Sequence, residues 1–298
     1  MNEAPLSLIE LNQLFHAYSN TELIDAKRND AAFANDVYDL INSSGQGYVM
    51  KVLKAHQDPK TINLETHIQT RLNAAGIKTP QYLDFGDNNF IGEQNECRFT
   101  LSRRIKGKIP IIITPELVFD FGATLARIHD CLKNVTIPLN RMQWFNPEIA
   151  QAALDACEEL PKDKLTMLVN KGTELFSLRL PEATIHGDLW LGNTFAEKDK
   201  VTAVFDFERA QNTARIIDLA RTYASMRKET VFPVQQIIDL LTTGYDSTAA
   251  IPLTRIENDN FKLAIAYVSG VIATWHATNG NRYTRRYIEI GEELTEES

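Results

Sequence analysis

The chain has 298 residues, a formal net charge of −8 and a hydrophobic content of 44%. This composition excludes an intrinsically disordered protein, and the length is sufficient for one large or two smaller domains. The acidic charge argues against nucleic acid as a partner, because phosphate backbones bind basic surfaces.

Other features narrow the class of protein further. The three cysteines are widely spaced and form no CxxC pair, so neither a disulfide framework nor a zinc site is indicated. The first residues lack the basic and apolar regions of a signal peptide, and no apolar run is long enough for a membrane span. We therefore expect a cytoplasmic protein without a membrane partner.

The first hundred residues predict strands with one long internal helix. A helix is expected over 6–17, and the internal one over 60–75, where Leu64, Ile68 and Leu72 recur every four residues. The turn sequence SSGQG favours a hairpin between two of the strands. The predicted strands cover residues 21–27, 35–41, 47–54, 81–87 and 96–105.

The pattern changes after about residue 107, where helices dominate. Two short strands are still expected, on either side of the turn EKDK. The strand-rich part followed by a helix-rich part indicates an α+β protein of two lobes, with a small antiparallel N-terminal sheet and a cleft between the lobes. We expect domains at 1–104 and 105–298, with a hinge at 101–107. The predicted helices cover residues 116–133, 147–160, 163–178, 214–228, 233–245, 259–277 and 281–293.

The most distinctive segment is IHGDLWLGN, residues 185–193. Its Asp188 and Asn193 have the spacing of the aspartate and asparagine in a kinase catalytic loop. Asp206 in VFDFE ends the next predicted strand, and a hairpin can return it beside Asn193. An amide oxygen and a carboxylate in this arrangement suit Mg²⁺. Taken alone, HGD also fits a turn at the end of a strand.

The strand-rich part contains a candidate ion pair. In YVMKVLK, Lys51 shares a strand face with Val49 and Leu53, whereas Lys54 lies on the other face and is the alternative. Glu65 is the only acidic residue of the helix that follows. Lys51 and Glu65 fit the lysine and glutamate that orient a nucleotide's phosphates in kinases. The simpler interpretation is a solvated lysine and a surface glutamate.

Together these segments resemble a known family. IHGDLWLGN, followed by VFDFERA and by DLA at 218–220, is similar to the aminoglycoside phosphotransferase and choline kinase family, whose members have a protein-kinase-like fold. The segments NDVYDL, YVMKVLK, LETHIQTRL, LSRRIKG and FGATLARIHD follow the family's order. The resemblance implies an ATP-dependent phosphotransferase whose partner is a small molecule with a hydroxyl acceptor.

The resemblance also implies roles for individual residues. Asp188 is expected to be the catalytic base, and Asn193 and Asp206 the ligands of Mg²⁺. Lys51, oriented by Glu65, is expected to contact the α- and β-phosphates of ATP.

The rest of the nucleotide site is expected from backbone groups. In place of a GxGxxG loop, Asn35 and its neighbours Ala34 and Asp36 are expected to cover the phosphates. Hinge groups at Ser102, Arg103 and Arg104 are expected to contact the base, and GTP is the alternative to ATP.

Two polar residues are expected to support the catalytic loop. His186 fits a structural role better than proton transfer, because Asp188 already occupies that position. Asp218 is expected to brace the loop by accepting backbone N–H bonds, and the alternative is a helix N-cap.

The acceptor is the least defined part of the prediction. Trp190, Glu208 and Trp275 are candidate substrate contacts, with core packing as the alternative for Trp275. Glu208 replaces the glycine of protein kinases, which favours a small-molecule kinase, and its charge favours an amine-bearing alcohol. We expect an aminoglycoside-, amino-alcohol- or sugar-like acceptor. The alternative function is a catalytically inactive, kinase-like nucleotide-binding protein, and the sequence does not set the oligomeric state.

Overall fold

A computed structural model of the chain describes residues 5–29, 35–54, 58–135, 137, 143–156, 161–279 and 283–295. The chain forms two compact units. Unit 1 comprises Met1–Ala74 with Lys78–Lys106, and unit 2 comprises Ala75–Ile77 with Gly107–Ser298. The sequence predicted a boundary after residue 104, and the observed boundary between the units lies two residues later, after Lys106.

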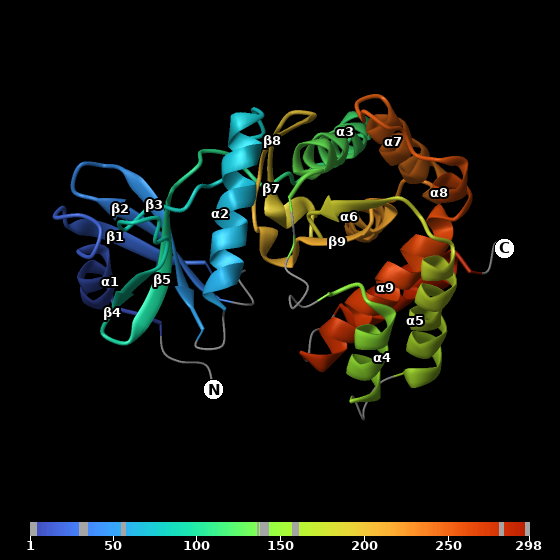
Figure 1. The fold of residues 1–298 in the computed structure, drawn as a ribbon, viewed down its shortest axis with the longest axis horizontal. Coiled ribbons are helices and arrows are strands. Elements are labelled where there is room, and N and C mark those ends of the chain that lie inside the picture. Colours follow the sequence, from blue (N-terminus) through green and yellow to red (C-terminus); the bar gives the residue numbers. More distant parts are fainter. Residues whose placement is uncertain are drawn as a thin grey trace. The chain divides into compact units, whose positions relative to one another are not determined.

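Unit 1 is built on a five-stranded antiparallel sheet with the order β1-β2-β3-β5-β4 (Figure 1). The hairpin expected at SSGQG joins β2 to β3. The strands are β1 (Leu23–Arg28), β2 (Asp36–Asn42), β3 (Gly47–Leu53), β4 (Gly92–Gln94) and β5 (Cys97–Arg103).

One predicted strand of unit 1 is wrong. Residues 81–87 form only an isolated bridge between Tyr82 and Ser102, because the backbone turns at Gly86, Asp87 and Asn88, which all have positive φ. The short strand β4 lies beyond this turn and was not expected, since three residues are too few for a clear alternating pattern.

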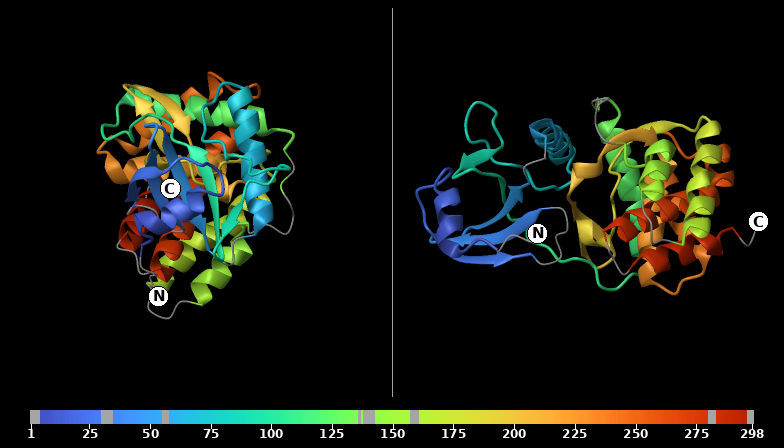
Figure 2. Two further views of the ribbon diagram at one scale, coloured as in Figure 1. Left: turned by 90° about the vertical axis from the view of Figure 1, so that its left-hand side faces the viewer. Right: turned by 90° about the horizontal axis from the view of Figure 1, so that it is seen from below.

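The two faces of the sheet carry different helices. Helix α1 (Leu8–Phe15) begins with a capping box and packs on a core that includes Tyr38, Leu40, Met50 and Phe99. Helix α2 (Pro59–Ala74) lies on the other side of the sheet, as Figures 1 and 2 show. Because side chains alternate along β3, Lys51 projects from the face opposite to that of Met50. The expected strand-plus-internal-helix architecture is therefore confirmed.

Unit 2 is mostly helical, with two small two-stranded sheets. Strand β6 (Glu182–Ile185) pairs with β9 (Gln211–Ala214), and β7 (Thr194–Glu197) pairs with β8 (Lys200–Val204) around the expected EKDK turn. Two single-turn 3-10 helices lie between these strands: η1 (Leu191–Asn193) directly precedes β7, and η2 (Phe207–Arg209) lies between β8 and β9. The helices are α3 (Pro115–Leu132), α4 (Pro147–Asp155), α5 (Lys162–Ser177), α6 (Ile216–Glu229), α7 (Val234–Asp246), α8 (Arg255–Asp259), α9 (Phe261–Thr278) and α10 (Thr284–Glu293).

The long helices of unit 2 agree with the sequence pattern, and three further elements are present. Strands β6 and β9 and the short helix α8 were not expected, since each is too short to show a period. Residues 157–160 and 281–282, which the predictions included in helices, lie outside the described residues. Among the described residues, no helix combines the length and the apolar character needed to cross a membrane.

Helices α3 and α7 pack unusually closely because each contributes a glycine to the contact. A Cβ at Gly122 would overlap the carbonyl oxygen of Leu241, and a Cβ at Gly244 would overlap that of Phe119. Figure 1 shows the two helices side by side. The overlapping atoms belong to backbone, so they cannot move aside as a flexible side chain can.

We predict that Gly244→Ala lowers the free energy of unfolding by about 1–3 kcal/mol, because the added methyl overpacks this contact. This direction is opposite to the gain that alanine brings over glycine in an open helix. Urea denaturation measures the change. Thr243→Ala, at the exposed neighbouring position, is the control, and an unchanged or raised stability of Gly244→Ala would contradict the prediction.

Candidate active site

The loop that carries Asp188 follows strand β6 and is shaped by a glycine. Gly187 has φ of +78°, a conformation that residues with a Cβ rarely adopt. A Cβ at this position would also overlap the carbonyl oxygen of Arg209. The chain therefore reverses at Gly187, and His186 and Asp188 stand on either side of the turn.

Asp218 of helix α6 stabilises this turn through hydrogen bonds. Its carboxylate accepts hydrogen bonds from the backbone N–H groups of His186 (2.7 Å) and Gly187 (2.9 Å) and lies 3.0 Å from His129 Nε2. Asp218 is fully buried. Burial alone raises the pKa of this carboxyl, but the hydrogen bonds from the His129 side chain and the His186 backbone outweigh it and hold the pKa below its ordinary value. Arg215, not Asp218, occupies the N-cap position of α6.

His186 links the loop to the end of strand β8. Its Nδ1 accepts the N–H of Asp188 at 3.2 Å, and its Nε2 lies 3.2 Å from the carbonyl oxygen of Phe205. This pair of partners requires the proton on Nε2, where it can be donated to the carbonyl. Complete burial lowers the pKa of His186, so the ring is neutral near pH 7. His186 therefore acts as a connector between two backbone segments.

The Asp188 side chain is held by an arginine that the sequence analysis missed. Arg221 donates to Asp188 Oδ1 from Nε (2.9 Å) and lies 2.8 Å from it through Nη2. Arg221 stands one helical turn after Asp218 on α6, so one face of this helix contacts both the loop backbone and the Asp188 carboxylate. Thr222 adds a hydrogen bond to the carbonyl oxygen of Leu189 at 2.8 Å.

A backbone hydrogen bond holds the two candidate metal ligands, Asn193 and Asp206, near each other. The N–H of Phe205, the residue before Asp206, donates to the carbonyl oxygen of Asn193 at 3.1 Å. Asn193 Nδ2 donates to the carbonyl oxygen of Asp188 at 3.0 Å, which leaves the amide oxygen as an acceptor. Asp206 is exposed and has φ of +71°.

This donor set fits a magnesium ion that also binds phosphate. Magnesium sites in such enzymes use one or two protein oxygens and complete their shell with phosphates and water. Within the described ranges, no group of three or more His, Cys, Asp or Glu side chains forms a metal site of its own. Asn193 and Asp206 therefore offer hard oxygens without a complete protein cage.

The acceptor candidates lie around the same loop. Trp190 is half-buried and covers Gly192, where a Cβ would overlap its ring. Glu208 is half-buried in η2. Trp275 of α9 is half-buried, and its ring lies 4.9 Å from the guanidinium carbon of Arg209.

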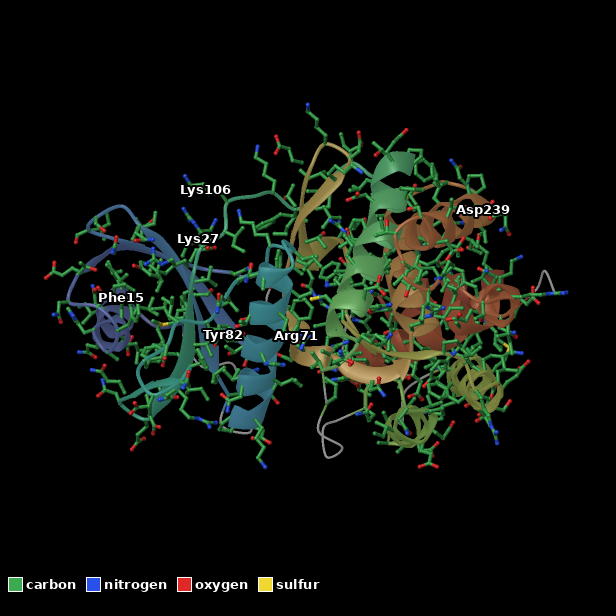
Figure 3. All side chains as sticks on the ribbon, turned by 45° about the horizontal axis from the view of Figure 1, so that its top comes forward. Phe15, Lys27, Arg71, Tyr82, Lys106 and Asp239 are labelled. Atoms are coloured by element: carbon green, nitrogen blue, oxygen red, sulfur yellow. The ribbon has the colours of Figure 1, made fainter. Side chains whose placement is uncertain are left out.

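The candidate nucleotide residues all lie in unit 1. Lys51 is half-buried in β3, and Glu65 is buried in α2, where the Tyr82 hydroxyl donates to its Oε2 at 2.7 Å. Figure 3 shows Tyr82 beside α2. Asn35 is buried just before β2, and Ala34 lies outside the described residues.

The candidate hinge residues follow one another at the end of β5. Ser102 is buried and pairs with Val49 across the sheet, whereas Arg103 is exposed. The backbone N–H of Arg104 donates to the carbonyl oxygen of Gly47 at 3.0 Å, and its side chain packs against that glycine.

We predict that Asp218→Asn lowers the free energy of unfolding by about 3–5 kcal/mol, because an amide group would turn a donor toward backbone N–H groups in a buried site. Chemical denaturation measures the loss. Asp239→Asn is the matched control, since Asp239 is exposed on α7 (Figure 3). Equal stabilities of the two variants would disprove the bracing role of Asp218.

A second prediction concerns His276 of α9. Burial, followed by the positive charges of Arg221, Lys228 and Arg209, lowers the pKa of His276 to about 4, and the charge of Asp188 opposes this only in part. Between pH 4 and its ordinary pKa of 6.5, the unfolded chain therefore binds more protons at this residue than the folded one. Stability that is present above pH 6.5 is consequently lost as the pH falls toward 4.

His276→Gln is expected to make the free energy of unfolding depend less steeply on pH between 4.5 and 6.5, by at most about one proton. Urea titrations at several pH values measure this slope. His67→Gln, which changes a histidine exposed on α2, is the control. The prediction fails if the slope of His276→Gln equals that of the unaltered protein.

Comparison with known proteins places the chain in context. Its sequence matches the phosphotransferase enzyme family over residues 25–251. The homoserine kinase of Methylobacillus flagellatus is 26% identical over 220 residues, which cover 72% of this chain and 67% of that protein. The homoserine kinase of Methylobacillus glycogenes is 25% identical over 231 residues, which cover 72% of this chain and 68% of that protein.

Solved structures show the same fold. An amicoumacin kinase in complex with AMP-PNP and Ca²⁺ superposes with a TM-score of 0.72 at 15% identity, covering 91% of this chain and 88% of that one. An aminoglycoside phosphotransferase in complex with GDP and kanamycin gives 0.66 at 16% identity, covering 98% and 100%. The expected kinase-like fold is thus confirmed. Because the family match also spans most of the sequence, this protein belongs to the phosphotransferase enzyme family.

Proposed function

We propose that this protein transfers the γ-phosphate of ATP to a hydroxyl group of a small molecule. The observation that carries the proposal is the arrangement around the loop 186–193 in unit 2. There, Asp188 is held by Arg221, and Asn193 is joined through the backbone to the residue before Asp206. Phosphoryl transfer to a hydroxyl requires a carboxylate that accepts the hydroxyl proton and oxygen ligands that hold the metal ion.

Asp188 orients the acceptor in this mechanism. Arg221 occupies its Oδ1, while Oδ2 has only a long contact of 3.4 Å with Asn193 Nδ2 and a 4.0 Å approach of Arg209. Oδ2 is therefore the oxygen that can accept a hydrogen bond from the acceptor hydroxyl and receive its proton. The salt bridge prevents rotation of the carboxylate, so the hydroxyl is held in one direction.

The remaining candidate residues would bind the phosphates of the nucleotide and neutralise their charge. Asn193 and Asp206 would hold Mg²⁺, which when bound neutralises charge on the phosphate oxygens. Lys51, supported by Glu65, would contact the nucleotide phosphates, and backbone groups at Asn35 would cover them. Ser102, Arg103 and Arg104 would lie at the base, and ATP and GTP are separated by measuring turnover with each.

The acceptor class is proposed from the relatives and from the local chemistry. The curated relatives are homoserine kinases, and the structural neighbours include kinases of aminoglycosides. We therefore propose amino alcohols, with homoserine among them, as the first acceptors to test, followed by aminoglycosides and sugars.

Asp188→Asn is expected to lower kcat by about 10²–10⁴-fold, because the amide cannot accept the hydroxyl proton. ATP binding, measured by calorimetry in the presence of Mg²⁺, is expected to persist. ADP release with the acceptor panel measures turnover, and Asp239→Asn on the exposed surface of α7 is the control. Near-normal turnover of Asp188→Asn would overturn the assignment of the base, and no turnover by the unaltered protein with any acceptor would favour a non-catalytic nucleotide-binding protein.

A further inference from the structure

Arg209 has surroundings unlike those of Arg215, Arg221 and Arg227, the other arginines of η2 to α6 in unit 2 that the structure describes. It ends η2, three residues after Asp206, and its Nε lies 4.0 Å from Asp188 Oδ2. Its guanidinium carbon lies 4.4 Å from the ring centre of Trp144 and 4.9 Å from that of Trp275. Two indole rings from distant parts of the sequence thus hold the guanidinium beside the proposed catalytic carboxylate.

The donors of Arg209 are unused. Among the residues that the structure describes, its side chain makes no hydrogen bond, and the approach to Asp188 at 4.0 Å is too long to be one. Arg227 provides a direct comparison, because its side chain is equally exposed, at 18%, yet it donates to both carboxylate oxygens of Glu293. Arg215 likewise donates to Glu257 and to two carbonyl oxygens.

The neighbouring positive charges already have partners. Arg221 is paired with Asp188, and Lys228 lies 3.0 Å from Glu229 and 4.1 Å from the ring centre of Tyr283. Arg209 differs from Arg221 and Lys228, since the structure shows no carboxylate of the described residues within hydrogen-bond distance of its guanidinium. A half-buried guanidinium with N–H donors that reach the surface and no described protein acceptor at hydrogen-bond distance is available to a ligand that carries an acceptor.

We propose that Arg209 binds a carboxylate group of the acceptor, so that the substrate carries a hydroxyl and a carboxylate on one short molecule. The planar fork of a guanidinium matches the two oxygens of a carboxylate in a bidentate pair. The short distance between Arg209 and Asp188 means that the hydroxyl and the carboxylate are only a few bonds apart. The inference rests on the proposed function, because it requires Asp188 to receive the acceptor hydroxyl.

This assignment separates hydroxy acids from the other acceptors considered. An aminoglycoside or a simple amino alcohol has no carboxylate and would leave Arg209 unpaired. A hydroxy amino acid such as homoserine supplies the carboxylate and still carries the amine that the acidic Glu208 favours. The competing role for Arg209 is a contact with the transferred phosphoryl group, and this role predicts an equal loss with every acceptor.

The test compares acceptors that differ only in the carboxylate. The pairs are homoserine with 3-aminopropan-1-ol, threonine with 1-aminopropan-2-ol, and serine with ethanolamine, and kanamycin represents acceptors without a carboxylate. We expect the unaltered protein to favour the acid of at least one pair by about 100-fold in kcat/KM, as expected for a bidentate charge pair that is largely shielded from water. In Arg209→Met, which keeps apolar packing between the two indoles, we expect the ratio within that pair to fall toward one, mainly through a raised KM for the acid.

Two further variants sharpen the result. Arg209→Lys keeps the charge without the fork and is expected to retain part of the preference. Arg255→Met is the control for removal of an arginine, because the Arg255 side chain is 93% exposed on α8. Thermal unfolding of each variant shows whether it is folded.

The outcomes separate the inference from the proposed function. Equal or better turnover of the acceptors without a carboxylate would overturn the role of Arg209 and leave the phosphotransferase function standing. An equal fall of kcat for both members of a pair in Arg209→Met would also overturn it, in favour of a contact with the phosphoryl group. Failure of the unaltered protein to phosphorylate any acceptor would overturn the proposed function and this inference with it.

Discussion

The candidate site depends on one buried carboxylate, that of Asp218. A carboxylate without exposure to water is stable only if hydrogen bonds compensate for the lost hydration. Asp218 obtains them from two backbone N–H groups of the loop and from His129. The loop is consequently tied to helix α6, and the same helix presents Arg221 to Asp188 and Thr222 to the following backbone. One helix thereby sets both the path of the loop and the direction of its aspartate.

The second part of the site is attached to the first through the backbone. His186 connects the loop to the carbonyl group of Phe205, and the carbonyl group of Asn193 accepts the N–H of the same residue. Asp206 is the next residue, so the hydrogen bonds that hold Phe205 also fix the position of Asp206 relative to the loop of Asp188. A site built in this way positions the proposed base and the two proposed metal-binding oxygens mainly through backbone hydrogen bonds, and the side chains of Asn193 and Asp188 share only a long contact of 3.4 Å. This rigidity is what phosphoryl transfer needs, because its catalysis is mainly positioning and charge neutralisation.

The arginines of unit 2 show how charge is used around the site. Arg215 is buried and fully engaged with Glu257 and nearby carbonyl oxygens, which makes it part of the structural framework. Arg221 is engaged with Asp188 and orients it. Arg209 has aromatic neighbours in place of acceptors. This difference in partners, and not a difference in residue type, distinguishes a binding group from two structural ones.

The sequence by itself determined much of this protein. The spacing of Asp188, Asn193 and Asp206, together with the hydrophobic periods, was sufficient to predict the α+β architecture, most helices and the loop that carries the site, because these are local patterns. The resemblance to the family also implied that Asp218 accepts backbone N–H bonds, the geometry that the structure shows. Local patterns failed at residues 81–87, where positive φ angles replace a strand, and at elements too short to show a period.

Only the tertiary structure decided which distant residues surround Asp188. Arg221 lies 33 positions away, and the indoles that flank Arg209 come from a loop before α4 and from α9. Nothing in the neighbouring sequence distinguishes these residues from any other arginine or tryptophan. Their roles arise from the packing of helices around the loop, since burial and the identity of the nearest partner determine whether a charge is structural, orienting or available to a ligand.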